Sequence, residues 1–470
     1  MNINTTHSRT ADATTRRHEG LASRAGRLCL ALAVAIIATA VPAAAQEPAP
    51  TTYAIVGARI VPVSGAPIDS GTIVFTGDRI AAVGANVTVP DAAIRIEGKG
   101  LTVYPGLIDM GASMGVSAPP PAREETIRTT EDQERAKRAA ILRPHLRVSD
   151  HLNPGDAALG RAATAGITSV LALPPGDTVR GQSEILLTTS GPDAPQIGAV
   201  ADDRRAGLVV HSPVALHVSF PGRPGSANGY PVSLMGGIAF VRQAFVDAQH
   251  QQAAIAHAER TRRPRPAPDA ALDAMAPALA GTLPVAFEAE SAREIHRALA
   301  MARAFEVTPI ITNAREADQV ATALRDANAR VVLSLNFPTR LPSLAPEADE
   351  PLETLRARAN APGAAAALQK AGVVFAFASH GLDNPADFLA NARKAVAAGL
   401  PADAALRALT LQAAMIAGAR DHVGSLETGK LANLLVTTGD LFDEKTTIAH
   451  VFVAGHRVDL NAAGNARRAP

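Results

Sequence analysis

The stretch Tyr104-Pro105-Gly106-Leu107-Ile108-Asp109-Met110-Gly111-Ala112-Ser113 decides which fold we expect for this chain. It is largely apolar, as a buried strand should be, and it leads into Gly111 and Ser113. Glycine has no side chain, and a serine hydroxyl is a poor ligand for a first-row metal ion compared with an imidazole. The stretch therefore predicts a strand that ends without a metal-binding side chain.

The region that this stretch opens, roughly residues 104–420, alternates short apolar runs with alanine-rich helical runs. Strand patterns occupy 166–173, 214–220, 283–287, 307–311, 330–335 and 373–378. Helical patterns occupy 291–303, 315–326 and 385–398. Such alternation favours a parallel sheet with helical crossovers. Periodicity alone does not separate an open sheet from a (β/α)8 barrel, but the length of the region favours an α/β fold of the TIM-barrel type.

Both ends of the chain have a β pattern instead. The early runs are 54–63, 71–75, 79–84 and 93–98, and the late runs are 431–437, 448–453 and 455–458. We expect the two segments 52–103 and 421–460 to pair into one small β-sandwich, with the barrel of residues 104–420 inserted between them. Residues 46–51 are then a short linker, and residues 461–470 are a tail.

The first 45 residues have the order of a secretory signal peptide: arginines, an apolar run at 28–41, and small residues up to Ala45. The apolar run is shorter than the ~20 residues of a membrane span, which favours cleavage over an uncleaved anchor. The adjacent Arg16 and Arg17 leave open whether export is general or of the twin-arginine type. We expect an exported protein, periplasmic or extracellular, with no membrane attachment after cleavage and without Cys29.

The composition excludes one class of partner. Of the 470 residues, 47% are hydrophobic and 19% are charged, which is typical of a globular chain. Lysine and arginine number 45 against 44 aspartates and glutamates, and aromatic residues make up only 3%. A chain without a basic run or an aromatic stacking surface is not expected to bind nucleic acid.

Two late segments connect these patterns to a known family. Residues 406–414 and Gly424-Ser425-Leu426-Glu427-Thr428-Gly429-Lys430-Leu431-Ala432-Asn433-Leu434-Leu435-Val436 resemble the closing helix and the returning strand of the amidohydrolase superfamily. With the opening stretch, the resemblance spans about 52–460, and it is strongest to the exported, imidazolonepropionase-like branch with degraded metal-binding motifs. The resemblance implies a (β/α)8 barrel and hydrolysis of C–N bonds in small cyclic amides and related compounds.

The resemblance also implies where metal ligands should stand. Members with activity have a His-x-His pair after the first barrel strand, one histidine after each of the fifth and sixth strands, and an aspartate after the eighth. The matching positions here are Gly111, Ser113, Glu288, Asn313 and His380. Since the usual ligands to zinc or another divalent metal are replaced, we expect no metal and no other cofactor.

Two of these replacements are candidates for catalysis. His380 is either a general base or a polar residue in the loop before a helix that Asp383 or Asn384 caps. Glu288 either forms a makeshift cation site with Glu290 and His380, or pairs with a nearby arginine in a filled barrel mouth. The residues alone leave both alternatives open, although pairing with an arginine is favoured for Glu288.

The remaining polar features have simpler interpretations. No nucleophile elbow surrounds Ser113, so a serine nucleophile is not expected there. We interpret four histidines as surface residues: His211, His217, His250 and His257. The Pro/Arg-rich stretch 259–271 is expected to be an exposed loop.

Three functions remain open at this point. The first is an exported, metal-depleted member of the superfamily that binds a small ligand or a partner subunit. The second is a working hydrolase of non-peptide C–N bonds with a rearranged site that uses His380 and Glu288. The third is a structural or regulatory partner of an active paralogue, which heterodimer formation would support. A monomer or homo-oligomer that binds a small ligand would count against it.

Overall fold

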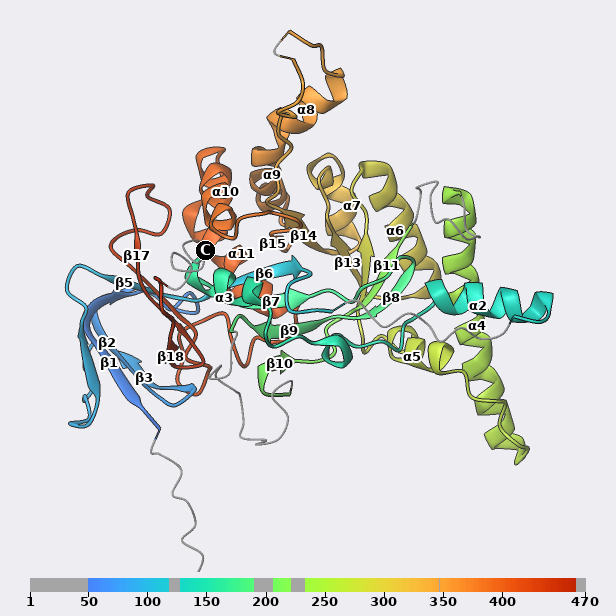
Figure 1. Ribbon diagram of the computed structural model, residues 1–470, viewed down its shortest axis with the longest axis horizontal. Coiled ribbons are helices and arrows are strands. Elements are labelled where there is room, and N and C mark those ends of the chain that lie inside the picture. Colours follow the sequence, from blue (N-terminus) through green and yellow to red (C-terminus); the bar gives the residue numbers. More distant parts are fainter. Residues whose placement is uncertain (1–49, 118–126, 190–205, 221–232, 346, 462–470) are drawn as a thin grey trace, which may run out of the picture. The chain divides into compact units, whose positions relative to one another are not determined.

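The computed structural model describes residues 50–117, 127–189, 206–220, 233–345 and 347–461, shown as a ribbon in Figure 1. The predicted signal peptide, most of the linker and nearly all of the tail lie outside the described residues. No helix in the described ranges has both the length and the apolar character that a membrane crossing requires.

The segments near the two ends form one mixed sheet. The strands are β1 (Thr52–Ile60), β2 (Ile68–Thr76), β3 (Arg79–Gly84), β4 (Ile94–Glu97), β5 (Thr102–Pro105), β16 (Leu434–Thr437), β17 (Ile448–Val453) and β18 (His456–Arg457). Their order is β18-β17-β16-β5-β1-β2-β3, with β4 beside β1. Because β5 pairs with β1 on one side and with β16 on the other, the expected two-layered sandwich is instead a single continuous sheet.

This sheet curls back on itself around its own core. Register shifts in β1 mark bulges, which bend a strand. The backbone of Ile80 in β3 is bonded to Lys430 and Gly429 just before β16, with N–O distances of 2.9 and 2.8 Å. Inside, the rings of Phe75 and Phe452 lie 4.9 Å apart in an edge-on contact. The curvature encloses enough apolar surface for the sheet to have a core separate from that of the barrel.

The middle of the chain forms the expected α/β barrel, with two short strands, β8 and β9, that the sequence did not predict. The barrel strands are β6 (Leu107–Ala112), β7 (Ile167–Ala172), β8 (Val179–Gln182), β9 (Glu184–Leu187), β11 (Leu216–Ser219), β12 (Val285–Glu288), β13 (Pro309–Thr312), β14 (Arg330–Ser334) and β15 (Phe375–Ala378). Only Ser183 separates β8 from β9, and this pair runs antiparallel to β7 on one side and to β11 on the other. The third barrel position therefore departs from an all-parallel barrel. The sequence did not predict it, because Arg180-Gly181-Gln182-Ser183-Glu184 is too polar for a strand pattern.

Hydrogen bonds link the last barrel strand to the first. The backbone N–H of His380 donates to the carbonyl of Gly111 at 3.2 Å, and the N–H of Ser379 donates to the carboxylate of Asp109 at 2.8 Å. Asp109 is completely buried in β6. The carboxylate of the opening stretch therefore fastens the end of β15 to β6.

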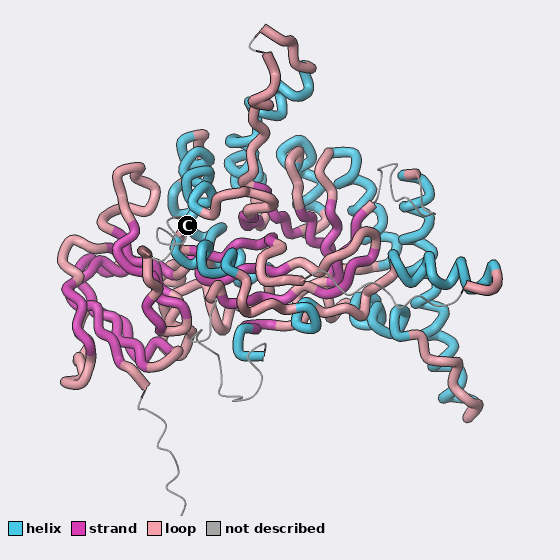
Figure 2. The backbone as a smooth tube through the Cα atoms, viewed as in Figure 1, coloured by secondary structure: helices cyan, strands magenta, loops and turns pink. Residues whose placement is uncertain are grey.

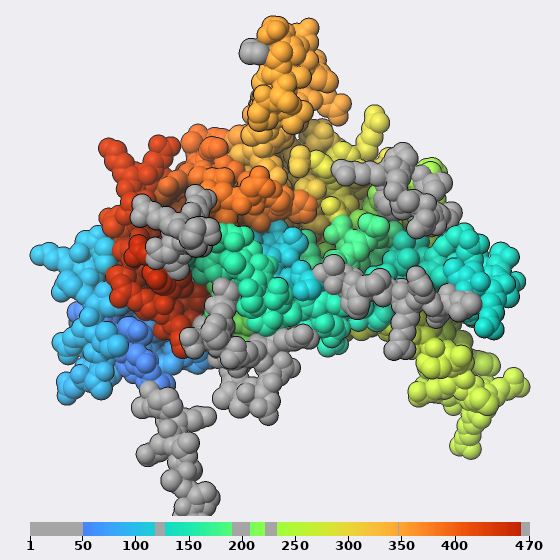
Figure 3. Space-filling view, in the orientation of Figure 1, coloured from blue at the N-terminus to red at the C-terminus, as the bar shows by residue number. Residues whose placement is uncertain are grey.

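Helices cover the barrel strands, as the tube view in Figure 2 shows. They are α2 (Thr130–Ile141), α3 (Ala157–Thr164), α4 (Leu234–Thr261), α5 (Ala270–Leu279), α6 (Ala292–Phe305), α7 (Ala321–Asp326), α8 (Leu352–Asn360), α9 (Ala364–Ala371), α10 (Ala386–Ala397), α11 (Ala402–Leu409) and α12 (Leu411–Ile416). Short 3-10 turns are η1 (Val148–His151), η2 (Ala206–Leu208), η3 (Ala317–Val320) and η4 (Ala361–Gly363), and β10 (Val209–His211) pairs with β9. α6 shows the sequence logic: Ser291 and Glu294 form a capping box, and Ile295 and Phe305 are buried. The space-filling view in Figure 3 shows the segment around α8 projecting from the surface.

Two local expectations need correction. The stretch 259–271 is not one loop, because α4 continues to Thr261 and α5 begins at Ala270. α4 ends where Arg262 adopts a left-handed conformation with φ of 53°. His250 and His257 are exposed on α4, as expected. His217 is not a surface residue: it is 4% exposed, and it belongs to the barrel.

Candidate functional site

Gly111 lies near the end of β6, in close contact with the end of β15. A Cβ atom added there would lie 3.1 Å from the Cβ of Ala378 and 3.7 Å from Nδ1 of His380. Gly111 therefore faces the end of β15. The family resemblance places expected metal ligands at the ends of both β6 and β15. Ser113 lies beyond the strand and is exposed, so its hydroxyl adds nothing to this group.

Glu288 stands at the end of β12 and points to the same face of the barrel as His217. The strand registers place His217 beside Ala286, two residues before Glu288, and Glu288 beside Thr312. Alternate residues of a strand share a face, and residues paired across strands do so as well. Carboxylate and imidazole therefore both face the inside of the barrel.

Arg180 pairs with Glu288 across the barrel mouth. An ion pair joins Nη2 of Arg180, on the antiparallel strand β8, to Oε2 of Glu288 on β12. Their side chains are 20% and 32% exposed, so the pair is largely shielded from solvent. Of the two interpretations of Glu288, pairing with an arginine is confirmed. The sequence did not identify Arg180 as that arginine, because β8 was not predicted as a strand.

His380 follows β15 with a left-handed backbone, φ 40°. Its Nε2 lies 3.9 Å from Oε1 of Glu288. Burial lowers the pKa of His380 to about 4, and the positive charges of Arg180 and Arg315 lower it in the same direction. The imidazole is therefore neutral at neutral pH.

The loop after His380 matches the alternative interpretation of this residue in part. Oδ1 of Asn384 accepts a hydrogen bond from the backbone N–H of Ala386, 3.3 Å away, at the start of α10. The residue just before α10 is Pro385, which forms no side-chain cap, so neither Asp383 nor Asn384 is the N-cap residue. Whether His380 and Glu288 act in catalysis stays a prediction.

Asn313 occupies the position after β13. Its backbone is left-handed, with φ 59°, a conformation that asparagine tolerates better than most residues. The side chain is 8% exposed, and Oδ1 is buried with no hydrogen-bond partner in the described part of the chain. The neighbouring Glu290 is held by Arg315, whose Nε lies 3.0 Å from Oε1 of Glu290. Glu290 is therefore not gathered with Glu288 and His380 into a cation site.

His217 is, with Arg180, a site residue that sequence reasoning missed. Burial lowers its pKa to about 3, with a further contribution from the charge of Arg180. Its Nε2 is buried without a hydrogen-bond partner among the described residues. The available signal was its position, since it and Ser219 are polar residues two apart in the otherwise apolar run 214–220.

These residues do not fit a metal ion well. Among the described residues, no group of three or more histidine, cysteine, aspartate or glutamate side chains is placed to hold one. Gly111 has no side chain to offer. Glu288 is engaged by Arg180, and a guanidinium donates hydrogen bonds but has no lone pair to give a metal.

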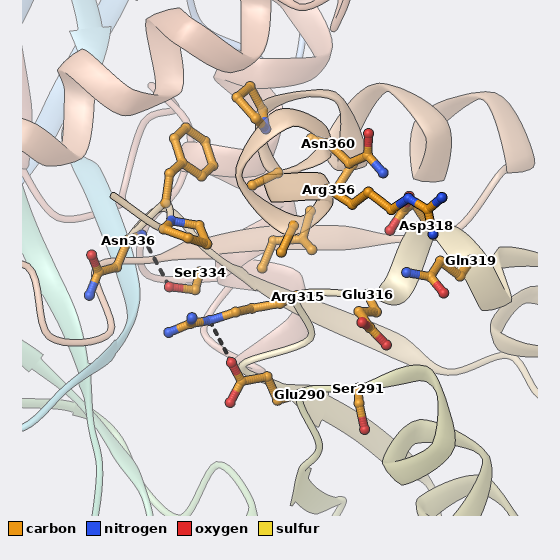
Figure 4. A pocket seen from close by; sticks show the side chains of 18 of the residues that line it. Glu290, Ser291, Arg315, Glu316, Asp318, Gln319, Ser334, Asn336, Arg356 and Asn360 are labelled. Carbon is orange, nitrogen blue, oxygen red and sulfur yellow. Dashed lines mark hydrogen bonds and ion pairs between the residues drawn. The ribbon is translucent and has the colours of Figure 1, made fainter. Parts of the chain in front are cut away.

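A cavity of about 940 Å³ adjoins the mouth. Figure 4 shows Arg315 crossing it, with Glu290, Ser334 and Asn336 near one end. Nδ2 of Asn336 donates to the carbonyl of His380 at 3.4 Å, which connects this end to the barrel mouth. At the other end lie Asp318, Gln319, Arg356 and Asn360, and apolar walls come from Leu333, Phe337 and Phe377. The cavity offers a small molecule both apolar surface and polar partners.

Comparisons with known proteins agree with this architecture. The sequence model of the amidohydrolase family matches residues 288–458, which include Glu288, Asn313 and His380. An amidohydrolase from Thermotoga maritima MSB8 is similar in structure, with 24% identity, a TM-score of 0.70, and coverage of 87% of this chain and 99% of that one. A prolidase solved with N-methylphosphonate-L-proline is 20% identical, with a TM-score of 0.51 and coverage of 87% and 100%. No curated protein matches the sequence. Similarity at this level describes the fold, and function has to be argued from the site.

Proposed function

We propose that the chain is a member of the amidohydrolase superfamily, whose family model matches residues 288–458, that it uses no metal ion in the barrel mouth, and that it binds a small molecule beside it. The observation that carries this proposal is the ion pair between Arg180 and Glu288. It commits the one carboxylate among the five expected ligand positions to a guanidinium.

The chemistry of a guanidinium supports the loss of metal-assisted hydrolysis. A metal ion in such a barrel lowers the pKa of a bound water and so generates a nucleophile at neutral pH. An arginine stays protonated and supplies positive charge, but it does not bind water as a Lewis acid does. The mouth therefore keeps a cation and loses the group that activates water.

The second candidate, a hydrolase with a rearranged site, is favoured by one distance. Nε2 of His380 lies 3.9 Å from Glu288, so the two side chains are neighbours. Their ionisation argues the other way, since a general base works best with a pKa near the working pH. The pKa of His380 is about 4, which makes it a weak base at neutral pH. We expect any such hydrolysis to be slow.

The ligand site that we propose is the cavity beside the mouth. Its volume of about 940 Å³ lies within the range of pockets that hold small molecules. Phe337 and Leu333 offer apolar contact, and Arg315 and Asn336 lie at the end nearest His380. We further propose that the mature chain acts outside the cytoplasm, as a homo-oligomer or beside an active paralogue. Copurification of such a relative would favour the partner role.

The first experiment is elemental analysis of the purified mature chain after dialysis without chelator. We expect zinc, iron and manganese far below one ion per chain, before and after incubation with each metal. About one ion per chain would overturn the proposal and restore metal-assisted hydrolysis as the leading function. Hydrolysis of a panel of cyclic amides, measured on the same samples, tests the rearranged site, because a rate that survives in His380→Gln would exclude that residue as the base.

A further inference from the structure

We propose that Arg180 is a tethered cation: its guanidinium supplies, from within the chain, the fixed positive charge that the barrel mouth of this fold otherwise takes from a metal ion. The inference rests on the proposed metal-free function. It assigns Arg180 as a positioning residue, whose charge holds the carboxylate of Glu288 in the barrel mouth. Nothing in the family resemblance gives an arginine this role.

The first argument is the place from which Arg180 comes. It lies on β8, which runs antiparallel to β11 and is followed after Ser183 by β9 of the other barrel sheet. Gly181 follows it with φ of 133° and sits so close to the carbonyl of Leu146 that a Cβ would lie 2.5 Å from that oxygen. A conformation reserved for glycine thus stands beside Arg180. The backbone is shaped to bring this side chain to the mouth.

The second argument is what surrounds the guanidinium. Glu288 pairs with it directly, and Asp177 acts on its charge from the loop before β8. Burial lowers the pKa of Arg180, but arginine remains protonated at any pH where the protein is folded. A charge buried to this extent requires a partner, and removal of one member of such a pair leaves the other uncompensated.

The third argument is the effect on two histidines. The charge of Arg180 reaches His217 on β11 and His380 after β15, so one side chain acts on both sides of the barrel interior. Other charged groups that face His380 are Glu288 from β12 and Arg315 from the segment after β13. The guanidinium of Arg180 thus holds one carboxylate and acts on two neutral imidazoles. A metal ion in a barrel mouth has the same electrostatic surroundings.

The experiment compares the mature wild type with Arg180→Met, Glu288→Gln and the double variant. We expect Arg180→Met to lower the melting temperature by roughly 5–10 °C, because it leaves the partly buried carboxylate of Glu288 unpaired. The double variant should recover most of that loss, since neither charge remains. Arg293→Met, at an exposed position on α6, is the matched control and should leave melting unchanged.

A second readout separates an electrostatic role from a merely structural one. Titration of His380 by NMR, with its signal assigned through His380→Gln, should give pKa values in the order wild type, double variant, Arg180→Met. In Arg180→Met, the freed Glu288 lies 3.9 Å away and favours the imidazolium, so a rise of more than about one unit is expected. An unchanged pKa in folded Arg180→Met, or a double variant no more stable than the single one, would overturn the inference. Bound metal in the wild type would instead overturn the proposed function.

Discussion

Gly106 and Gly111, two glycines of the stretch 104–113, lie at opposite ends of β6, one at the base of the barrel and one at its mouth. Gly106 lies at the base, where its N–H donates to the carbonyl of Asn433 at 2.9 Å and joins β6 to the terminal sheet. A Cβ there would lie 2.1 Å from Oγ1 and 2.6 Å from Cβ of the buried Thr168. Gly111 lies at the mouth, and the nearest atom to a Cβ there is 3.1 Å away. A Cβ at the base would therefore overlap with Thr168, whereas a Cβ at the mouth would need Ala378 to shift by only a few tenths of an ångström.

Two buried asparagines repeat this contrast. At the base, Nδ2 of Asn433 donates to Ser169 at 3.2 Å, and its Oδ1 accepts from Ala454 at 2.7 Å. At the mouth, Oδ1 of Asn313 has no partner among the described residues. Buried polar groups are normally bonded, so an unbonded one is a cost that the rest of the fold must offset. The asparagine at the base has partners for its amide nitrogen and its oxygen, whereas the asparagine at the mouth has an oxygen without one. Oγ1 of Thr168 at the base is also buried without a partner among the described residues, so the contrast concerns the two asparagines and not the whole of each region.

The most direct test of this difference is to add a methyl group at each of the two glycines. Gly106→Ala should lower the free energy of unfolding by about 3 kcal/mol or more, because Thr168 is buried, β-branched and unable to move aside. Gly111→Ala should cost less than about 1 kcal/mol, since Ala378 has to yield only a few tenths of an ångström. Urea unfolding of both variants measures the difference. Equal losses would show that the mouth is packed as tightly as the base.

The second prediction concerns pH and belongs to the mouth. The pKa values of His217 and His380 are lowered to about 3 and about 4, below the unfolded value near 6.5. As pH falls below 6.5, the unfolded chain takes up protons that the folded chain does not, so stability falls until the folded pKa values are reached. We expect a loss of roughly 3 kcal/mol for each histidine between pH 6.5 and pH 4.

Urea midpoints between pH 7 and pH 4 measure this loss. His380→Gln and His217→Gln should each make the decline shallower, whereas replacement of the exposed His250 should not change it. Asp109 acts in the opposite direction, because burial raises its pKa and its protonation favours the folded state as pH falls. A decline that is the same in all three variants would refute the assignment to the buried histidines.

The sequence predicted individual strands better than it predicted contacts between segments that are far apart in the chain. Strands such as β3 and β17 were predicted to the residue, because their apolar pattern is local. The positions of Glu288, Asn313 and His380 at strand ends also followed from motifs. The Arg180–Glu288 pair did not, because it joins residues far apart in the chain through a strand whose sequence is polar. The single terminal sheet was missed for a similar reason, since it depends on which strands lie beside β5.

The last and smallest effect sharpens the contrast between the two asparagines. Asn433→Ala removes two hydrogen bonds and leaves the buried Ser169 hydroxyl and the N–H of Ala454 without these partners, at a cost of about 2 kcal/mol. Asn313→Gly keeps the left-handed backbone and removes an oxygen that has no partner, so stability should change by less than about 0.5 kcal/mol. Urea unfolding of both variants, with m-values compared to verify a common unfolded state, measures the pair. A large loss in Asn313→Gly would mean that its oxygen is bonded in solution, for example to water, and that Asn313 is not the less satisfied of the two asparagines.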